Sequence, residues 1–128
     1  MEDCAPLQPT FTGYIDSVDD AMTVIKACLQ GHLRHLPRQL SHSERDRLIR
    51  NGSVFIYEAG CSGFTTWDDG MRWEAAREYN GFYIRRMLSD TTILGSQGGA
   101  LRKKTMNVQI GQCVHYLVAY YYEHDLRL

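Results

Sequence analysis

The sequence lacks a strong excess of charge of either sign. Its 128 residues carry 14 Lys and Arg against 15 Asp and Glu, which gives a formal net charge of −1 at pH 7. Because contacts to phosphates supply most non-specific affinity for nucleic acids, this balance excludes a uniformly basic binder of that class. A charged binding surface, if there is one, must come from the way the charges are distributed.

Long apolar runs and paired cysteines are also missing. No stretch approaches the roughly 20 apolar residues of a membrane helix, and the first residues are acidic, unlike those of a secretory signal. The four cysteines, at 4, 28, 61 and 113, form no Cys-x-x-Cys pair. We therefore expect an intracellular protein with reduced thiols and no membrane partner.

Motifs of catalysis are absent as well. The sequence has no nucleophile elbow, no P-loop and no Gly-x-Gly-x-x-Gly after a strand, and its Gly-rich run at 95–99 lacks the lysine of a phosphate cradle. We expect no enzyme, no cofactor and no small-molecule substrate. An enzyme would have to combine scattered residues, such as His115, Tyr121 and Glu123.

A metal site has only a weak basis in the sequence. Cys28, His32 and His35 stand close together near the end of a predicted helix. Their spacing is short and no fourth ligand is assigned, whereas zinc sites usually consist of two ligand pairs separated by a loop. We expect no bound metal.

The patterns that are present predict one small domain, since a chain of this length and 44% hydrophobic content builds one core. Helices are predicted from Ser17 or Asp16 to Gly31, and from a Ser41-x-x-Glu44 capping box to Asn51-Gly52. The predicted strands cover 10–15, 53–58, 82–88 and a hairpin of 101–110 and 113–122 that turns at Gly111-Gln112. Residues 59–63 and 89–99 are predicted as a flexible lead and a linker. The fold class we expect is α+β, with an antiparallel sheet of about six strands and two or more short helices packed outside.

The most distinctive stretch holds both tryptophans. Trp67 and Trp73 bracket Asp69-Gly70, a dipeptide typical of a tight reversal in which the aspartate bonds its own backbone. Two large rings around a turn indicate a surface loop that is anchored from below, and such loops often carry function. The simpler interpretation, a hairpin whose tryptophans only fill the core, stays open.

The charges are unevenly distributed along the chain. The stretch 72–104 holds seven basic and three acidic residues, and the stretch 34–50 holds five arginines and two acidic residues. A basic face can therefore exist on a nearly neutral protein.

The tryptophan stretch resembles the signature of the WOPR domain, found in fungal regulators of morphogenesis and sporulation. The matching residues are Trp67, Asp69, Gly70, Trp73 and Arg77. A second block also resembles the family, in Lys103-Lys104-Thr105, Gly111-Gln112, His115-Tyr116-Leu117 and Tyr120-Tyr121. The departures are Thr66 in place of arginine, Asp68 in place of threonine, and Glu74 and Ala76 in place of serines. On this basis residues 1–128 form a single WOPR-like domain, with conserved blocks at 10–88 and 100–124 and a short linker at 89–99.

The resemblance implies a nuclear transcription regulator that binds double-stranded DNA sequence-specifically, with a basic loop in the minor groove of an A·T-rich site. Other transcription regulators are further candidate partners. The expected DNA-binding residues are Arg72, Arg77, Thr66, Trp67, Arg34, Arg38, Arg102, Lys103 and Lys104. Of these, Arg72 and Arg77 are expected at the groove and Arg102, Lys103 and Lys104 at phosphates. The expected supports of the loop are Asp69, Gly70 and Trp73.

A second hypothesis keeps the fold but not the ligand: a WOPR-like protein-interaction module with weakened or lost DNA binding. The net charge and the departures at Thr66, Asp68 and Glu74 favour it. An exposed Asp68 carboxylate would repel a phosphate by about a kcal/mol or less. The sequence leaves open the target bases, the oligomeric state, whether the regulator activates or represses, and whether the chain is a piece of a longer protein.

Overall fold

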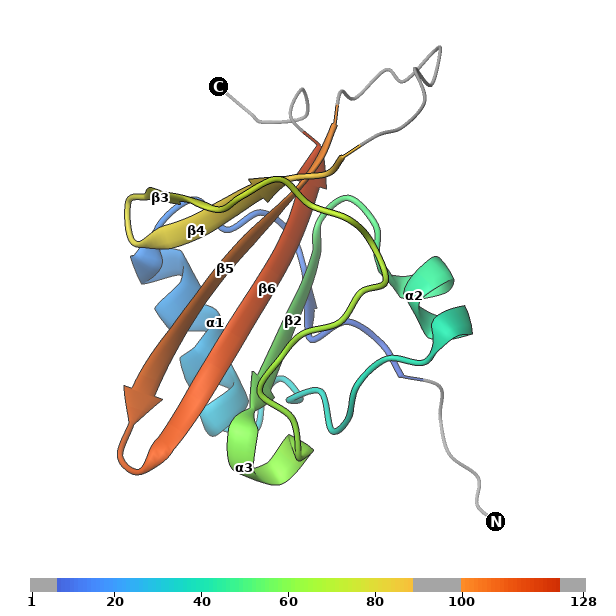
Figure 1. Ribbon diagram of the computed structural model, residues 1–128. Helices are drawn as coiled ribbons and strands as arrows, with labels where there is room; N and C mark the ends of the chain where they lie inside the picture. Colours follow the sequence, from blue (N-terminus) through green and yellow to red (C-terminus); the bar gives the residue numbers. More distant parts are fainter. Residues whose placement is uncertain (1–6, 89–99, 123–128) are drawn as a thin grey trace.

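In the computed structural model, which describes residues 7–88 and 100–122, six antiparallel strands form one sheet (Figure 1). Their order across the sheet is β1-β2-β6-β5-β4-β3. The strands are β1 (Phe11–Thr12), β2 (Ser53–Glu58), β3 (Arg77–Tyr79), β4 (Phe82–Arg86), β5 (Leu101–Ile110) and β6 (Cys113–Tyr122). The helices are α1 (Val18–Leu29), α2 (His42–Leu48) and α3 (Ala59–Ser62). The expected α+β domain with its antiparallel sheet and short outer helices is confirmed.

The long hairpin of β5 and β6 forms the centre of the sheet. Its register runs from Leu101 opposite Tyr122 to Ile110 opposite Cys113. Gly111 closes the turn with a φ of 63°, a value that favours glycine. Both strands and the turn match the prediction from sequence, because apolar alternation and a glycine turn are strong local signals.

Each face of the sheet carries its own core, because successive side chains of a strand point to opposite faces. One face packs against α1 and buries Val54, Ile56, Leu117 and Ala119 of the sheet. The opposite face buries Phe55, Tyr57, Val118 and Tyr120. That second face is covered by α2, by the segment before it and by the tryptophan stretch. Among residues 7–88 and 100–122, no helix is long and apolar enough to cross a membrane.

The helix ends follow the capping signals. The Ser17 side chain accepts a hydrogen bond from the Asp20 amide at the start of α1, and Ser41 and Glu44 form the expected capping box of α2. Helix α2 ends at Leu48, earlier than predicted. The cause is Ser53, whose hydroxyl donates to the Leu48 carbonyl over 2.6 Å and accepts from the Arg50 amide over 3.1 Å.

Two predictions of local structure are wrong, and one strand was not predicted. The first strand keeps only β1, because Thr10 turns inward and its hydroxyl accepts from the Ile56 amide. The predicted flexible lead contains α3, which Gly63 closes at a φ of 80°. Strand β3 was not predicted; it forms because Asn80-Gly81 makes a tight turn with positive φ at both residues. The predicted linker 89–99 and the last two residues of the second block lie outside the described residues.

Candidate nucleic-acid interface

The tryptophan stretch crosses the sheet face opposite α1, where a ladder of aromatic rings holds it (Figure 1). The Tyr57 ring lies between those of Phe64 and Tyr116, with centroids at 4.2 and 4.8 Å. Trp67 stacks on the same Tyr57 ring at 5.6 Å. The rings fix where the chain leaves α3 and begins the loop.

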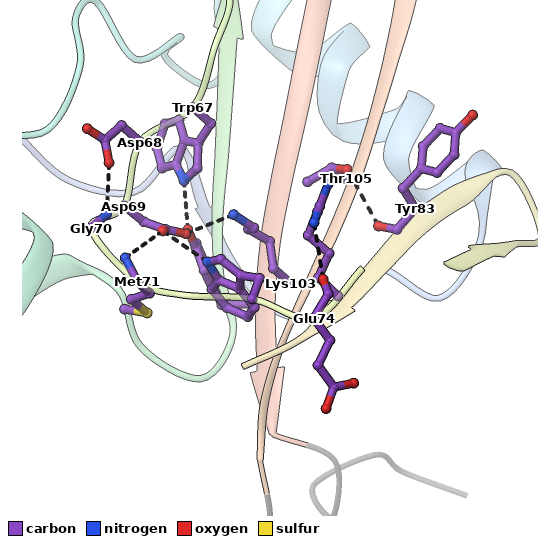
Figure 2. A network of polar contacts seen from close by, with 12 residues as sticks. Trp67, Asp68, Asp69, Gly70, Met71, Glu74, Tyr83, Lys103 and Thr105 are labelled. Carbon is purple, nitrogen blue, oxygen red and sulfur yellow. Dashed lines mark hydrogen bonds and ion pairs between the residues drawn. The ribbon is translucent and has the colours of Figure 1, made fainter. Parts of the chain in front are cut away.

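The centre of the loop is the buried carboxylate of Asp69, which is 5% exposed (Figure 2). Its Oδ1 accepts from the Met71 amide at 3.1 Å and from Trp73 Nε1 at 3.0 Å. Its Oδ2 accepts from the Tyr120 hydroxyl at 2.7 Å and from Lys103 Nζ at 3.0 Å. Four donors on one carboxylate satisfy it fully, as a buried charge requires.

Trp67 joins the hydrogen-bond network around Asp69. Trp67 Nε1 donates to the Tyr120 hydroxyl over 2.7 Å, so both indoles are linked to Asp69. Burial on its own raises the pKa of Asp69, but the bonds from Tyr120 and Trp73 and the Lys103 charge hold that pKa below its ordinary value. The carboxylate is therefore ionised at neutral pH. The centre of the loop is thus an ionised carboxylate that accepts four hydrogen bonds, and not an apolar cluster.

Helix α2 braces the outside of the same loop. Gly70 has a φ of 75°, and a Cβ built there would meet Arg45 Nη1 at 2.6 Å. Arg45 Nη2 lies 3.2 Å from Asp68 Oδ2, while the other oxygen of Asp68 accepts from the Gly70 amide. Gln39 holds the loop's start, because its amide group donates to the Thr66 carbonyl and accepts from the Asp68 amide. The Asp68 charge is thus balanced within the chain.

Arg72 lies between two anchored residues and faces outward. The side chains of Met71 and Trp73 are half-buried, and that of Arg72 is exposed. The backbone here joins the sheet edge, since the Arg72 carbonyl accepts from the Leu88 amide over 2.9 Å and Trp73 bridges to Met87. An exposed guanidinium on a fixed backbone suits contact with an anionic groove.

Arginines also gather across β3, β4 and the start of β5. Arg77 and Arg102 line one hollow of about 190 Å³ together with Arg86, which lies opposite Arg102 in the strand register. Glu74 lies in the same hollow, its Oε2 3.4 Å from Arg86 Nη1. The structure therefore brings together two of the expected residues and adds Arg86, which the sequence analysis counted only among the basic residues of 72–104.

The surroundings of Lys103 and Lys104 differ from those expected of phosphate contacts. Lys103 is 8% exposed and its ammonium is bound to Asp69, over the face of Trp73. Lys104 points to the other face of the sheet, where its Nζ donates to the Ile15 carbonyl and lies over the rings of Phe82 and Tyr121. Burial lowers the pKa of both lysines. Both ammonium groups are thus bound within the chain, that of Lys104 on the sheet face that it shares with Arg102.

The remaining expected residues have different surroundings. Arg38 makes a two-pronged pair with Glu44, at 2.8 and 2.9 Å, which lowers the pKa of Glu44 to about 2. Arg34 is exposed but lines a separate hollow beside residues 7–10. Thr66 is exposed next to the loop, whereas the half-buried Trp67 supports it from below.

Residues missed by the sequence analysis are mainly Gln39 and Arg45. Gln39 belongs to no motif, so nothing in the sequence marks it. Arg45 is part of the basic stretch 34–50, and only the placement of α2 against the loop gives it a role.

The alternative sites of the sequence analysis do not assemble. Within residues 7–88 and 100–122, no three His, Cys, Asp or Glu side chains are positioned to hold a metal ion. Cys28 is buried on the core-facing side of α1, and His35 contacts His115. Tyr121 and His115 stand six residues apart on β6, or roughly 20 Å, and Glu123 lies outside the described residues.

Comparisons with known proteins agree with this geometry. The sequence pattern of the Gti1/Pac2 family matches residues 10–98. The chain is 40% identical over 88 residues to the global transcription regulator sge1 of Fusarium oxysporum, covering 69% of this chain and 27% of that protein. It is 39% identical over 98 residues to the global transcription regulator sge1 of Verticillium dahliae, covering 77% of this chain and 19% of that protein. The matched part is thus less than a third of either regulator.

A solved structure gives the same fold. The WOPR domain of Wor1 from Candida albicans, in complex with a 13 bp double-stranded DNA, superposes with a TM-score of 0.82 at 29% identity. The superposition covers 94% of this chain and 80% of that one.

Proposed function

Since the chain belongs to the Gti1/Pac2 family, we propose that it is the sequence-specific double-stranded DNA-binding domain of a fungal transcription regulator. Its resemblance to WOPR domains is confirmed by the family match and by the Wor1 fold. Curated relatives are named as global transcription regulators, and two similar solved structures are complexes with double-stranded DNA. The domain acts in the nucleus, uses no cofactor and catalyses no reaction. Its two conserved blocks are 10–88 and 100–124.

The observation that carries this proposal is the exposed Arg72 on a loop fixed by Asp69. A loop that is already ordered loses little conformational entropy on binding, so more of the contact energy contributes to affinity. The minor groove of A·T-rich DNA is narrow and strongly negative, and it attracts an inserted arginine. Arg72 therefore enters the minor groove.

We assign the phosphate contacts to arginines of β3, β4 and β5. Arg77, Arg86 and Arg102 share one hollow there, and guanidinium groups bind phosphate oxygens well. In our assignment of backbone contacts, Arg77 and Arg86 join Arg102 and take the place of Lys103 and Lys104. Thr66 lies at the start of the loop, where its carbonyl accepts from Gln39, the neighbour of Arg38.

Fluorescence anisotropy with labelled duplexes tests the proposal. The domain is titrated into an A·T-rich duplex and into a G·C-rich duplex of equal length, over a series of salt concentrations. We expect tighter binding to the A·T-rich duplex and a dissociation constant that rises steeply with salt. A folded sample that binds neither duplex at low salt contradicts the proposal and supports the protein-interaction module.

A further inference from the structure

Two histidines from distant parts of the sequence contact each other at one end of the sheet. His35 lies in the segment of residues 30–41 that joins α1 to α2, called the connector below (Figure 1). Its Nε2 lies 3.2 Å from Nδ1 of His115 in β6, and the two ring centroids are 5.2 Å apart. His115 is 3% exposed and His35 is half-buried, so water reaches the pair only in part.

The connector passes around the edge of β2 from one core to the other. Leu33 packs against the core on the α1 face of the sheet, whereas Leu36 and Leu40 are buried in the core of the opposite face. At the crossing, the Leu36 amide donates to the Ile56 carbonyl of β2 over 2.6 Å. The histidine contact is made at the residue just before this hydrogen bond.

The far part of the connector is attached to the candidate DNA-binding loop. Gln39 stands four residues after His35 in the sequence. Its side chain donates to the Thr66 carbonyl and accepts from the Asp68 amide. A change in how the connector lies on β2 therefore reaches the loop around Asp69 through Gln39.

The number of protons on the two rings decides whether their contact can form. A neutral imidazole has one donor and one acceptor nitrogen, so two neutral rings share one N–H. One additional proton still leaves an acceptor nitrogen on the other ring, and the bond persists. When both rings are charged, no acceptor remains, and two positive groups face each other across 3.2 Å. The contact therefore tolerates one added proton and not two.

Burial opposes protonation of His35. Burial lowers the pKa of His35 from its ordinary 6.5, a charge on His115 lowers it further, and the Glu58 carboxylate raises it, with a net lowering. Glu58 lies opposite His115 in the register of β2 and β6. The other titratable groups of the surrounding elements are His32 and Arg34 of the connector, Cys61 of α3 and Cys113 of β6, while β5 places Val108 opposite His115 and α1 has no charged residue after Lys26.

We propose that the pair of His35 and His115 is a pH-sensitive switch, which holds the connector on β2 at neutral pH and releases it in mild acid, when both rings are protonated. On release, the Leu36 amide loses the Ile56 carbonyl, and Gln39 no longer fixes the start of the loop. The affinity of the loop for DNA then falls, a consequence that rests on the function proposed above.

Acid weakens the attachment because the pKa of His35 is lowered in the folded protein. A histidine with a lowered folded-state pKa binds fewer protons when folded than when unfolded, so it favours the attached connector at higher pH. This contribution is present in full above about 6.5, the ordinary value, and is lost as the pH falls below it. Glu44 acts in a separate range, since its pKa is about 2.

Hydrogen exchange of single amides, followed by NMR on the full chain, tests the switch at about pH 7.5 and about pH 5.5. After correction for the intrinsic exchange rate, we expect the protection of the Leu36 amide to fall by about tenfold or more at the lower pH. The amides in the centre of β6 should stay protected. The ring signals of His35 and His115 should titrate in two coupled steps, the second accompanying the loss of protection. Unchanged protection of Leu36, or an equal fall throughout β6, overturns the proposal.

His35→Gln is the matched variant, because the new amide can donate to His115 Nδ1 but carries no charge at any pH. We expect the protection of Leu36 in this variant to be independent of pH over the same range. The control is His32→Gln, which removes an exposed histidine three residues earlier and should keep the wild-type dependence. A His35→Gln protein that still loses the protection of Leu36 in acid overturns the proposal. If this variant does not fold, the wild-type titration decides it.

Anisotropy on the A·T-rich duplex at the same two pH values tests the coupling to the loop. Protonation of the exposed histidines acts alike on wild type and on His35→Gln, so the ratio of their dissociation constants isolates the switch. We expect the wild-type constant to rise about fivefold or more relative to the variant at the lower pH. A constant ratio, with the connector released, overturns the coupling. Failure of both proteins to bind at the higher pH contradicts the proposed function instead, and the exchange result still decides the switch.

Discussion

The ammonium of Lys103 lies 3.0 Å from the buried Oδ2 of Asp69. This pair connects the middle of the sheet to the loop between the tryptophans, and both side chains are at most 10% exposed. The lysine that the sequence suggested for phosphate binding holds the loop from inside instead. The charged pair of Lys103 and Asp69 therefore holds the shape of the loop, while exposed charges remain available for a ligand.

Asp69→Asn should destabilise the domain by about 3 kcal/mol, because a neutral amide leaves the Lys103 charge buried and uncompensated. Urea denaturation measures the loss of unfolding free energy. The matched control is Asp68→Asn on the adjacent residue, whose side chain is 64% exposed and which should cost no more than about 1 kcal/mol. Equal losses for the two variants would show that the buried pair does not hold the loop.

Gly70→Ala should weaken DNA binding, whereas Gly63→Ala should not. Both glycines have φ near 80°, at 75° and 80°, so each alanine costs about 1 kcal/mol of stability through backbone strain. Only at Gly70 does the new Cβ meet Arg45, at 2.6 Å; at Gly63 nothing lies within 4 Å. Urea denaturation and anisotropy on the A·T-rich duplex separate the two effects. A similar loss of affinity for both variants contradicts the bracing of the loop by α2.

The Arg45–Asp68 pair should control how strongly the Asp68 charge opposes DNA. Arg45→Ala frees that carboxylate and should raise the dissociation constant about two- to fivefold, the range of an exposed ion pair. Asp68→Asn should lower the constant slightly, and the double variant should recover most of the affinity lost in Arg45→Ala. Anisotropy of all four proteins at one salt concentration completes the cycle. Strictly additive effects would mean that the two side chains act independently on DNA.

Glu44 makes the stability of the domain depend on pH in the acidic range. Arg38 and the Ser41 cap lower the pKa of Glu44 from 4.5 to about 2. A lowered folded-state pKa stabilises the protein above the unfolded value, and this contribution is lost as pH falls from about 4.5 to about 2. Glu44→Gln should therefore cost stability at pH 7 and progressively less toward pH 2. Urea midpoints at several pH values test this, and a cost that stays constant with pH would refute it.

The sequence predicted the parts of the fold that depend on neighbouring residues. The capping box at Ser41 and the turn at Gly111 are local, and each is found as expected. Gly70 has the positive φ that the sequence suggested, but the chain makes only a bend there. Strand β3 escaped prediction because its three residues, Arg77–Tyr79, are all exposed and show no alternation of burial. Only pairing with β4 makes them a strand.

For the candidate site, the sequence indicated the loop but not its environment. Trp67, Asp69 and Trp73 stand close together in the chain, so their motif was visible. The partners Lys103 and Tyr120 come from β5 and β6, and whether a strand lysine faces solvent or a buried carboxylate depends on register. Gln39 and Arg45 depend likewise on how α2 and its preceding segment pack.

The most direct test of the account compares Arg72→Ala with Lys26→Ala for binding to the A·T-rich duplex. Both variants remove one exposed positive charge, but Lys26 lies in the last turn of α1, on the other face of the sheet. We predict at least a tenfold rise in the dissociation constant for Arg72→Ala and less than a twofold rise for Lys26→Ala, because losing one groove contact costs about 1–3 kcal/mol. Equal effects of the two variants, with both proteins folded, would contradict the assignment of the loop around Asp69 as the DNA contact.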